Sequence, residues 1–556
     1  MNHKKIFILF FLHVVFFSFA QQIYNHASVV CAKKDVADLA IKVIKDGGNA
    51  FDAMVVTELG LAASYPFAGS LGGGGFMVYR TKESVSGCLN FREKAPKKAS
   101  KDMFLDNNGN VIVGKSTDSG LAIGVPGNIA GIYAAHEKFG KLPMKNLLKR
   151  VIRFIEKGFI ITEYQAKSLN KTRKDFDKNN LEKIFYSREW KAGEICKNIA
   201  LAKTLKRILK NGKDEFYKGE TAKKIVEFTS KNGGILSMED LSSYTVEWQK
   251  PIEVNYKDFK VFSMSPPSSG GIALGQMLKI AEGYKLNTFK HNSNEYIQLL
   301  TEIERRVYAD RAYFLGDPNF VKVPIAELLS DEYAKERMKD FSWEKATLSS
   351  AVSHGNIPGF EHDETTHYSI VDSDGNAVAV TTTINGAYGS KLYSNDLGFF
   401  FNNQMDDFSI KPGTPNLFGL VGGYANQIEP GKRMLSSMTP TIVEKKGKLF
   451  MVLGSPGGST IITSVFQNIL NVTEFNMGMQ ESVSAARFHH QWLPDEIRVE
   501  NSKGFIDKDL EILRNKGYHL VVGESVVVGK VDAILVKDGK LESGADPRGD
   551  DAASGF

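Results

Sequence analysis

The sequence predicts an α+β protein whose helices gather in the first two thirds of the chain and whose strands gather in the last third. Residues 142–315 repeat apolar side chains with the helical period. Beyond Thr365 the pattern changes, because residues 366–371 and 377–384 read as the two strands of a hairpin. At 556 residues the chain exceeds one ordinary core. We therefore expect one large domain or two that pack closely.

The first part of the chain alternates short strands with helices. A glycine run from Gly69 to Gly75 lies inside it and leads into a strand rather than opening a helix. We therefore expect a tight backbone turn beside a site and not a phosphate cradle. The expected elements are a strand at 28–31, helices at 36–44 and 50–63, and a strand at 76–80.

The rest of the chain continues this mixed pattern. The longest helix is expected at 296–315, where Gly316 and Pro318 end it. Residues 348–364 are polar, lack an apolar period and are expected to form a linker. Further strands are expected at 397–401, 441–443 and 448–453, with helices from 461 and at 479–486 and a terminal α/β stretch.

The N-terminus has the layout of an export signal. Lys4 and Lys5 precede an apolar stretch at 6–17, and small residues follow at Ser18 and Ala20. An uncleaved anchor fits less well, since the apolar run is shorter than about 18 residues. We expect residues 1–20 to be a signal peptide and the mature protein to be exported, to a periplasm or the extracellular medium, without a stable membrane span.

Composition argues against several classes of protein. The formal charge of +6 becomes +4 without the two signal lysines, which gives no reason to expect nucleic acid as a partner. Three cysteines offer neither a disulfide framework nor zinc spacing. Asp406 and Asp407 lack the spacing of a cation loop, and His489 and His490 would point opposite ways on a strand. We expect no metal and no cofactor.

Two motif searches give negative results. Residues 109–116 fit the phosphate-loop pattern, but their interior is β-branched and strand-like and no helix follows. The sequence contains no Gly-x-Ser-x-Gly elbow, which counts against an α/β-hydrolase triad.

Thr365 is the strongest catalytic candidate. It opens a strand-like run directly after the polar pair Asp363-Glu364. If the bond between Glu364 and Thr365 breaks, one residue carries both a hydroxyl nucleophile and an α-amine that titrates near neutrality, at about 7.7–8.0. The plainer interpretation is that Thr365 only starts a β-hairpin, as threonine often does. Thr383, on the return strand, could then hydrogen-bond to Thr365 or pair with it for stability alone.

Three further segments carry chemistry. Gly457 and Gly458 join a strand to a helix, so their amides could form an oxyanion hole or only a flexible turn. The polar run 402–408 follows an apolar strand and could grip an ammonium with one carboxylate. Arg92 could clamp a carboxylate with its planar fork, although most strand arginines form surface salt bridges.

Together these residues make the chain resemble the γ-glutamyltranspeptidases (γ-glutamyltransferases), exported members of the N-terminal nucleophile hydrolase superfamily. The resemblance spans nearly the whole mature chain. It is carried by five stretches: Thr365 to Ser369, Asn402 to Phe408, Leu435 to Met438, Gly454 to Ser459 and Arg487 to Trp492.

The resemblance implies a fold and a maturation step. The fold would be a four-layer αββα sandwich built jointly by two subunits of one precursor. Self-cleavage between Glu364 and Thr365 would give a large subunit, residues 21–364, and a small catalytic subunit, residues 365–556, which stay together as a heterodimer.

The resemblance also implies a reaction and a division of roles. Thr365 would attack the γ-carbonyl of glutathione or a related γ-glutamyl amide, and the acyl group would pass to water, an amino acid or a dipeptide. The implied roles are as follows: Gly457 and Gly458 hold the oxyanion, Thr383 orients the nucleophile, Arg92 with Ser436 and Ser437 binds the α-carboxylate, and Asn385, Gln404 and Asp407 bind the α-ammonium.

Two positions depart from the family pattern. Phe418 stands where many bacterial members have a lid tyrosine, so the lid could not donate a hydrogen bond towards Asn385 and would close by apolar packing. Met434 replaces the proline expected before Leu435. The balance between hydrolysis and transfer is therefore left open.

Two alternatives compete with this function. One is an acylase of the same superfamily that acts on a β-lactam side chain, for which Asp407 would have no ammonium to bind. The other is an exported protein that binds glutamyl compounds and never cleaves itself.

Overall fold

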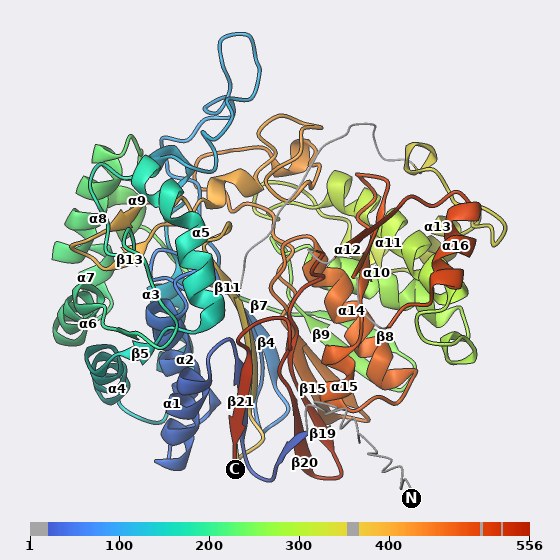
Figure 1. Ribbon diagram of the computed structural model, residues 1–556, viewed down its shortest axis with the longest axis horizontal. Coiled ribbons are helices and arrows are strands. Elements are labelled where there is room, and N and C mark those ends of the chain that lie inside the picture. The colour runs from blue at the N-terminus through green and yellow to red at the C-terminus, as the bar shows by residue number, and fades with distance from the viewer. Residues whose placement is uncertain (1–20, 353–365, 501–503, 524–525) are drawn as a thin grey trace, which may run out of the picture.

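Two seven-stranded antiparallel sheets form the centre of the protein. The computed structural model describes residues 21–352, 366–500, 504–523 and 526–556. Figure 1 shows the two sheets side by side with one group of helices on the left and another on the right. The four layers follow the order helix, sheet, sheet, helix, so the predicted α+β class and αββα sandwich are confirmed.

The left sheet contains the hairpin predicted after Thr365. Its strands are, in spatial order, β21 (Ala552–Gly555), β2 (Ser28–Cys31), β10 (Thr366–Val371), β11 (Ala377–Thr383), β3 (Gly74–Arg80), β4 (Ser86–Phe91) and β7 (Glu247–Gln249). Thr366 pairs with Thr382, and the register continues to Val371 and Ala377. The hairpin thus lies between two strands from the first part of the chain, β2 and β3.

The right sheet is also built from both parts of the chain. Its strands are, in spatial order, β1 (Gln22–Tyr24), β20 (Lys540–Gly544), β19 (Asp532–Lys537), β15 (Lys448–Gly454), β14 (Thr441–Lys445), β9 (Phe259–Ser263) and β8 (Ile252–Tyr256). An apolar core fills the space between the sheets, with Phe76 and Val78 from the left sheet and Ile442 and Val452 from the right.

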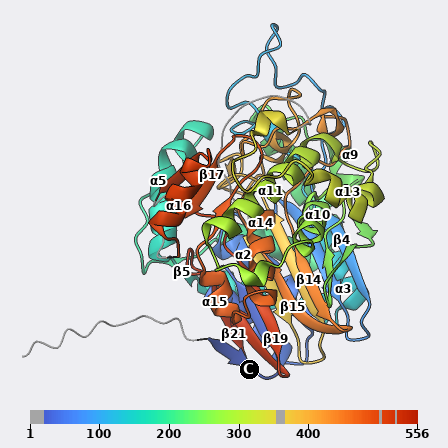
Figure 2. The same cartoon turned by 90° about the vertical axis from the view of Figure 1, so that its right-hand side faces the viewer.

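Helices cover the outer face of each sheet. Figure 2 shows α10, α11 and α14 in front of strands β14 and β15. The helices of the left group are α1 (Lys34–Lys45), α2 (Ala50–Ser64), α3 (Asn128–Phe139), α4 (Met144–Lys157), α5 (Glu163–Asn179), α6 (Ile199–Asn211), α7 (Asp214–Tyr217), α8 (Glu220–Lys231) and α9 (Met238–Ser242). Those of the right group are α10 (Gly270–Glu282), α11 (Asn294–Phe314), α12 (Ile325–Leu328), α13 (Asp331–Arg337), α14 (Thr460–Thr473), α15 (Met479–Ser484) and α16 (Asp507–Asn515).

Three smaller sheets complete the fold. They pair β5 (Phe159–Ile160) with β6 (Ile195–Cys196) and β12 (Tyr393–Ser394) with β13 (Phe399–Phe400). In the third, β17 (Ile497–Glu500) lies between β16 (Phe488–His489) and β18 (Leu520–Gly523) and pairs with both.

The structure corrects three sequence predictions. Residues 142–315 are not only helical, because they contain β7, β8 and β9, and Ile252–Tyr256 alternates buried and exposed positions as a strand should. The interior of 109–116 is not a strand but an irregular loop with a single bridge from Leu105 to Val111. The strand expected at 397–401 spans only Phe399–Phe400.

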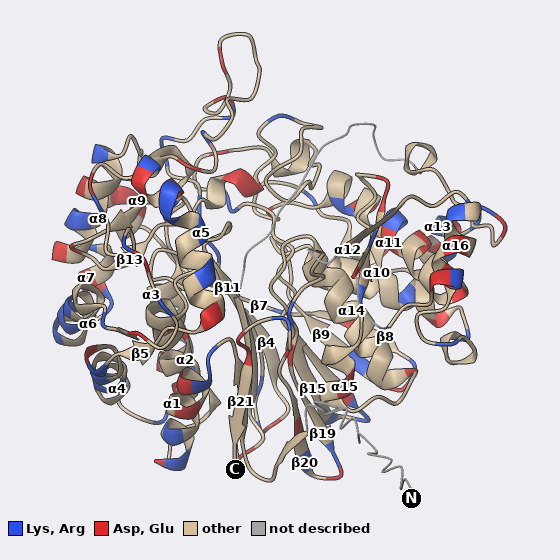
Figure 3. Ribbon diagram, in the orientation of Figure 1, with Lys and Arg blue, Asp and Glu red and all other residues tan. Residues whose placement is uncertain are grey.

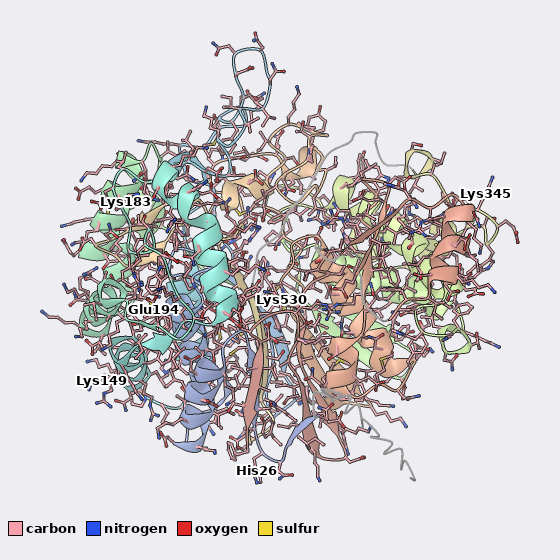
Figure 4. The ribbon with its side chains drawn as sticks, in the orientation of Figure 1. His26, Lys149, Lys183, Glu194, Lys345 and Lys530 are labelled. Carbon is pink, nitrogen blue, oxygen red and sulfur yellow. The ribbon has the colours of Figure 1, made fainter. Side chains whose placement is uncertain are left out.

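Charged residues of both signs are spread over the outer helices (Figure 3). Lys149 and Lys183 project from the periphery, whereas Lys530 lies near the centre and donates to the Tyr65 hydroxyl at 3.0 Å (Figure 4). Within the described part of the chain no helix is both long and apolar enough to cross a membrane. The predicted signal at residues 1–20 lies outside the described residues.

Glu58 of the fully buried helix α2 ties that helix to the hairpin of β10 and β11. Its carboxylate accepts hydrogen bonds from Tyr368 of β10 and Thr382 of β11, each at 2.9 Å. Burial nevertheless raises the pKa of Glu58 to about 7. The folded protein therefore holds this proton more tightly than the unfolded chain does, and the stability from Glu58 falls as the pH rises from about 4.5 to about 7.

We predict that Glu58→Gln reduces this pH dependence, because the amide keeps the shape of the side chain but does not ionise. The difference in melting temperature between variant and wild type should move in favour of the variant between pH 5 and pH 8, by about 1 °C for each kcal/mol of unfolding free energy in a chain of this length. Thermal unfolding at both pH values measures it. An equal difference in melting temperature at pH 5 and at pH 8 would contradict the raised pKa of Glu58.

Candidate active site

A cavity lies where the C-terminal ends of strands β4, β11 and β15 converge. Arg92 directly follows β4, Thr383 ends β11, and Gly458 lies four residues past the end of β15. Helix α11 and two loops close the sides. The side chains that line it and matter below are Arg92, Arg311, Thr383, Asn385, Gln404, Asp407, Phe418, Ser436 and Ser437.

An ion pair between Arg92 and Asp407 crosses the cavity. The Arg92 Nη2 donates to Asp407 Oδ2, and both side chains are at least nine-tenths buried. Burial raises the pKa of the Asp407 carboxyl, while Arg92 and the Gln404 amide act against that rise. The resemblance assigns Arg92 and Asp407 to opposite ends of a substrate, whereas here the two groups contact each other.

The polar groups around this pair are only partly satisfied. The Gln404 Nε2 donates to Asp407 Oδ2 at 2.7 Å. Gln404 Oε1 and Arg92 Nε are buried, and neither has a hydrogen-bond partner among the described residues. Because buried polar groups without partners are costly, these two atoms mark where a polar ligand can bind.

Thr383 and Asn385 form a strained turn at the end of β11. Asn385 adopts φ +74°, a conformation that is uncommon for a residue other than glycine. Its amide N donates to Thr383 Oγ1 at 2.8 Å, and its Nδ2 donates to the Asn403 carbonyl at 3.0 Å. The turn therefore holds the Thr383 hydroxyl oxygen at the cavity wall.

Ser436 and Ser437 present their hydroxyl groups from the opposite wall. Ser436 Oγ accepts from the Met438 amide at 3.1 Å, and Ser437 Oγ accepts from Arg311 Nη2 at 3.0 Å. Both serines line the cavity together with Arg92.

Gly457 and Gly458 form the turn between β15 and α14. Their φ angles are +128° and +47°, which favour glycine. A Cβ on Gly457 would lie 2.4 Å from Thr460 Oγ1. Within the described part of the chain neither amide N–H donates to another group. Two free N–H groups beside a helix N-terminus suit an anionic oxygen.

Asp406 anchors the loop that carries Phe418. It accepts from Ser116 Oγ at 2.6 Å and from the Leu417 amide at 2.7 Å. Burial raises the pKa of Asp406 to about 6. The Phe418 side chain lines the cavity, is 5% exposed and belongs to the same apolar cluster as Leu420.

Two members of the site were not found from the sequence. Arg311 lies in the last turn of α11, where a basic residue is expected to be solvated, and only the tertiary structure turns it inward. Asp406 was considered only as half of a metal pair. Conversely, Glu364 and Thr365 lie outside the described residues, and Thr366 is the first described residue after them.

The fold and the cavity define a sandwich of the N-terminal nucleophile hydrolase type. Among solved structures, cephalosporin acylase from Bacillus halodurans superposes with a TM-score of 0.84 at 24% identity and covers 97% of both chains, which shows the fold alone. γ-Glutamyltranspeptidase from Helicobacter pylori is 38% identical with a TM-score of 0.56, and the match covers 58% of this chain and 94% of that one.

Sequence comparison gives the particular family. The profile described as Gamma-glutamyltranspeptidase matches residues 36–556. The glutathione hydrolase proenzyme of Escherichia coli is 44% identical over 93% of this chain and 90% of its own length, and that of Pseudomonas aeruginosa is 44% identical over 92% and 91%. The chain belongs to the γ-glutamyltranspeptidase family.

Proposed function

We propose that this protein is a self-cleaving glutathione hydrolase and γ-glutamyltransferase. The observation that carries the proposal is the cavity itself, where a buried cation and a buried anion lie side by side in a chain of this family. The α-carbon of a γ-glutamyl group bears one carboxylate and one ammonium, so a site with both charges matches it. An acyl group without an amine would leave Asp407 without a ligand.

Maturation would create the nucleophile. The Thr365 hydroxyl attacks the carbonyl carbon of Glu364, the acyl group moves from nitrogen to oxygen, and water then cleaves the resulting ester. The products are residues 21–364 and 365–556. Interleaving of strands from both parts in each sheet supports a stable heterodimer, since neither product contains a complete sheet.

The same hydroxyl would then carry out turnover. The free α-amine of Thr365 takes the hydroxyl proton as the oxygen attacks the γ-carbonyl, and it returns a proton to the departing amine. The Gly457 and Gly458 amides would stabilise the oxyanion, and Thr383 would orient the nucleophile. A γ-glutamyl ester remains on Thr365 until water or an acceptor amine removes it.

Binding would use the groups that the ion pair leaves available. Arg92, with Ser436 and Ser437, would hold the α-carboxylate, and Arg92 Nε has no partner in the described part of the protein. The α-ammonium would be held by Asn385, Gln404 and Asp407. Gln404 Oε1 can accept a hydrogen bond from it, because this atom is buried and has no partner among the described residues. Each end of the substrate thus meets the opposite charge.

The proposed function also includes export of the chain. We propose that residues 1–20 direct the chain across a membrane and that the mature N-terminus is Gln21, in a periplasm or outside the cell. Small γ-glutamyl compounds and acceptor amino acids or dipeptides would be met there.

The direct test of this function is a denaturing gel with an activity assay. Wild-type protein is expected to give two bands and to release glutamate from glutathione, whereas Thr365→Ala should remain one band without activity. Thr366→Ala is a matched control, because the neighbouring threonine has the same chemistry but would not become the N-terminus. A single wild-type band with full activity would refute the proposal.

Asp407→Ala separates substrate binding from maturation, because the two steps need different contacts. We predict that the chain still splits and that KM for a γ-glutamyl anilide rises about 10- to 100-fold, the effect of one lost charge-assisted contact. Asp407→Asn, which keeps the shape, should lose affinity in the same direction. Unsplit Asp407→Ala protein would contradict this assignment.

A further inference from the structure

Arg311 is a cationic residue that lines the cavity and has no role in the proposed reaction. Its side chain is 5% exposed and reaches the cavity from the last turn of α11. Its Nε donates to Ser269 Oγ at 2.9 Å and its Nη2 donates to Ser437 Oγ at 3.0 Å. Both acceptors are neutral hydroxyl groups.

Arg311 differs from two nearby buried arginines, because each of those has a carboxylate as its ion-pair partner. Arg306 on the same helix pairs with Glu302 at 2.5 Å, and Arg92 across the cavity pairs with Asp407. In the described ranges no carboxylate lies within 4.0 Å of the Arg311 guanidinium. Burial lowers the pKa of Arg311 to about 10, although Tyr308 and Asp407 act in the opposite direction. A buried cation of this kind favours an anion beside it.

The contact with Arg311 also fixes the direction of the Ser437 hydroxyl. An arginine N–H can only donate, so Ser437 Oγ is the acceptor and its own proton must point elsewhere. The same holds for the hydroxyl proton of Ser436, because the Ser436 oxygen accepts a hydrogen bond from the Met438 amide. Among the described residues neither hydroxyl proton has an acceptor. Both serines line the cavity, so each has a hydroxyl proton that it can donate to a ligand there.

We infer that Arg311 is a positioning residue for the α-carboxylate of the γ-glutamyl donor. It holds the Ser437 hydroxyl as a donor, and its charge supplies the attraction that Arg92, already paired with Asp407, supplies only in part. The site thus requires a free carboxylate next to the amine of the donor. This inference rests on the proposed function and adds a determinant of its specificity.

The experiment compares two competitive inhibitors of γ-glutamyl anilide hydrolysis. L-Glutamate carries the α-carboxylate, and 4-aminobutyrate keeps the amine and the γ-carboxyl but lacks it. We define the ratio as the inhibition constant of 4-aminobutyrate divided by that of L-glutamate. In Arg311→Gln we expect this ratio to shrink about 10- to 100-fold, as one lost charge-assisted hydrogen bond would cause. KM for the anilide should rise by a similar factor while kcat changes little.

Controls separate this role from a purely structural one. Arg306→Gln removes another buried arginine of the same helix, and it should leave the ratio of the inhibition constants unchanged. An equal rise of both inhibition constants in Arg311→Gln would overturn the inference.

A second variant covers the case in which Arg311→Gln does not fold or split. Arg311→Lys keeps the charge but cannot contact both serine oxygens with a planar fork, so its ratio should also shrink, by about tenfold or less. A wild-type ratio in that variant would overturn the inference. Wild-type protein that hydrolyses no γ-glutamyl anilide would instead refute the proposed function.

Discussion

The pairing of β10 and β11 between β2 and β3 is the constraint on which the rest of the structure depends. It places the hairpin that begins one residue after Thr365 in the middle of a sheet, with strands from the first part of the chain on both sides. The side chains of Glu58, Tyr368 and Thr382 fix the hairpin to the helix layer. A peptide bond can break at the start of such a strand without loss of the fold, because the ladder hydrogen bonds and the apolar core between the sheets remain.

Charged side chains dominate the electrostatics of the cavity. Three charged side chains that line the cavity are withdrawn from water: Arg92, Asp407 and Arg311. The first two neutralise each other in the absence of substrate, which lowers the cost of burying them. The third has only hydroxyl partners in the described structure, so the cavity is biased towards an anion even before a ligand enters. A glutamyl group, with its carboxylate next to an ammonium, completes this set of charges.

The resemblance to the family implied the sandwich and named residues that line the cavity, sequence patterns predicted the elements around it, and the failures have physical causes. The hairpin after Thr365, the strand before Gly457 and the helix after it follow from local periodicity and glycine positions, which the fold preserves. Strands β7 to β9 were missed because they are three to five residues long and lie between helices. Arg311 could not be predicted, because its inward direction is set by the packing of α11 against the 435–438 loop. The contact between Arg92 and Asp407 is likewise a property of tertiary structure, since 315 residues separate them.

The central claim is that Thr365, freed as an N-terminus, forms an ester with a γ-glutamyl group. Mass spectrometry of peptides from protein treated with an electrophilic glutamine analogue tests it most directly. The account predicts one adduct, on the side-chain oxygen of Thr365 at the first position of the shorter fragment. An adduct on any other residue, or on a Thr365 still bonded to Glu364, would contradict it.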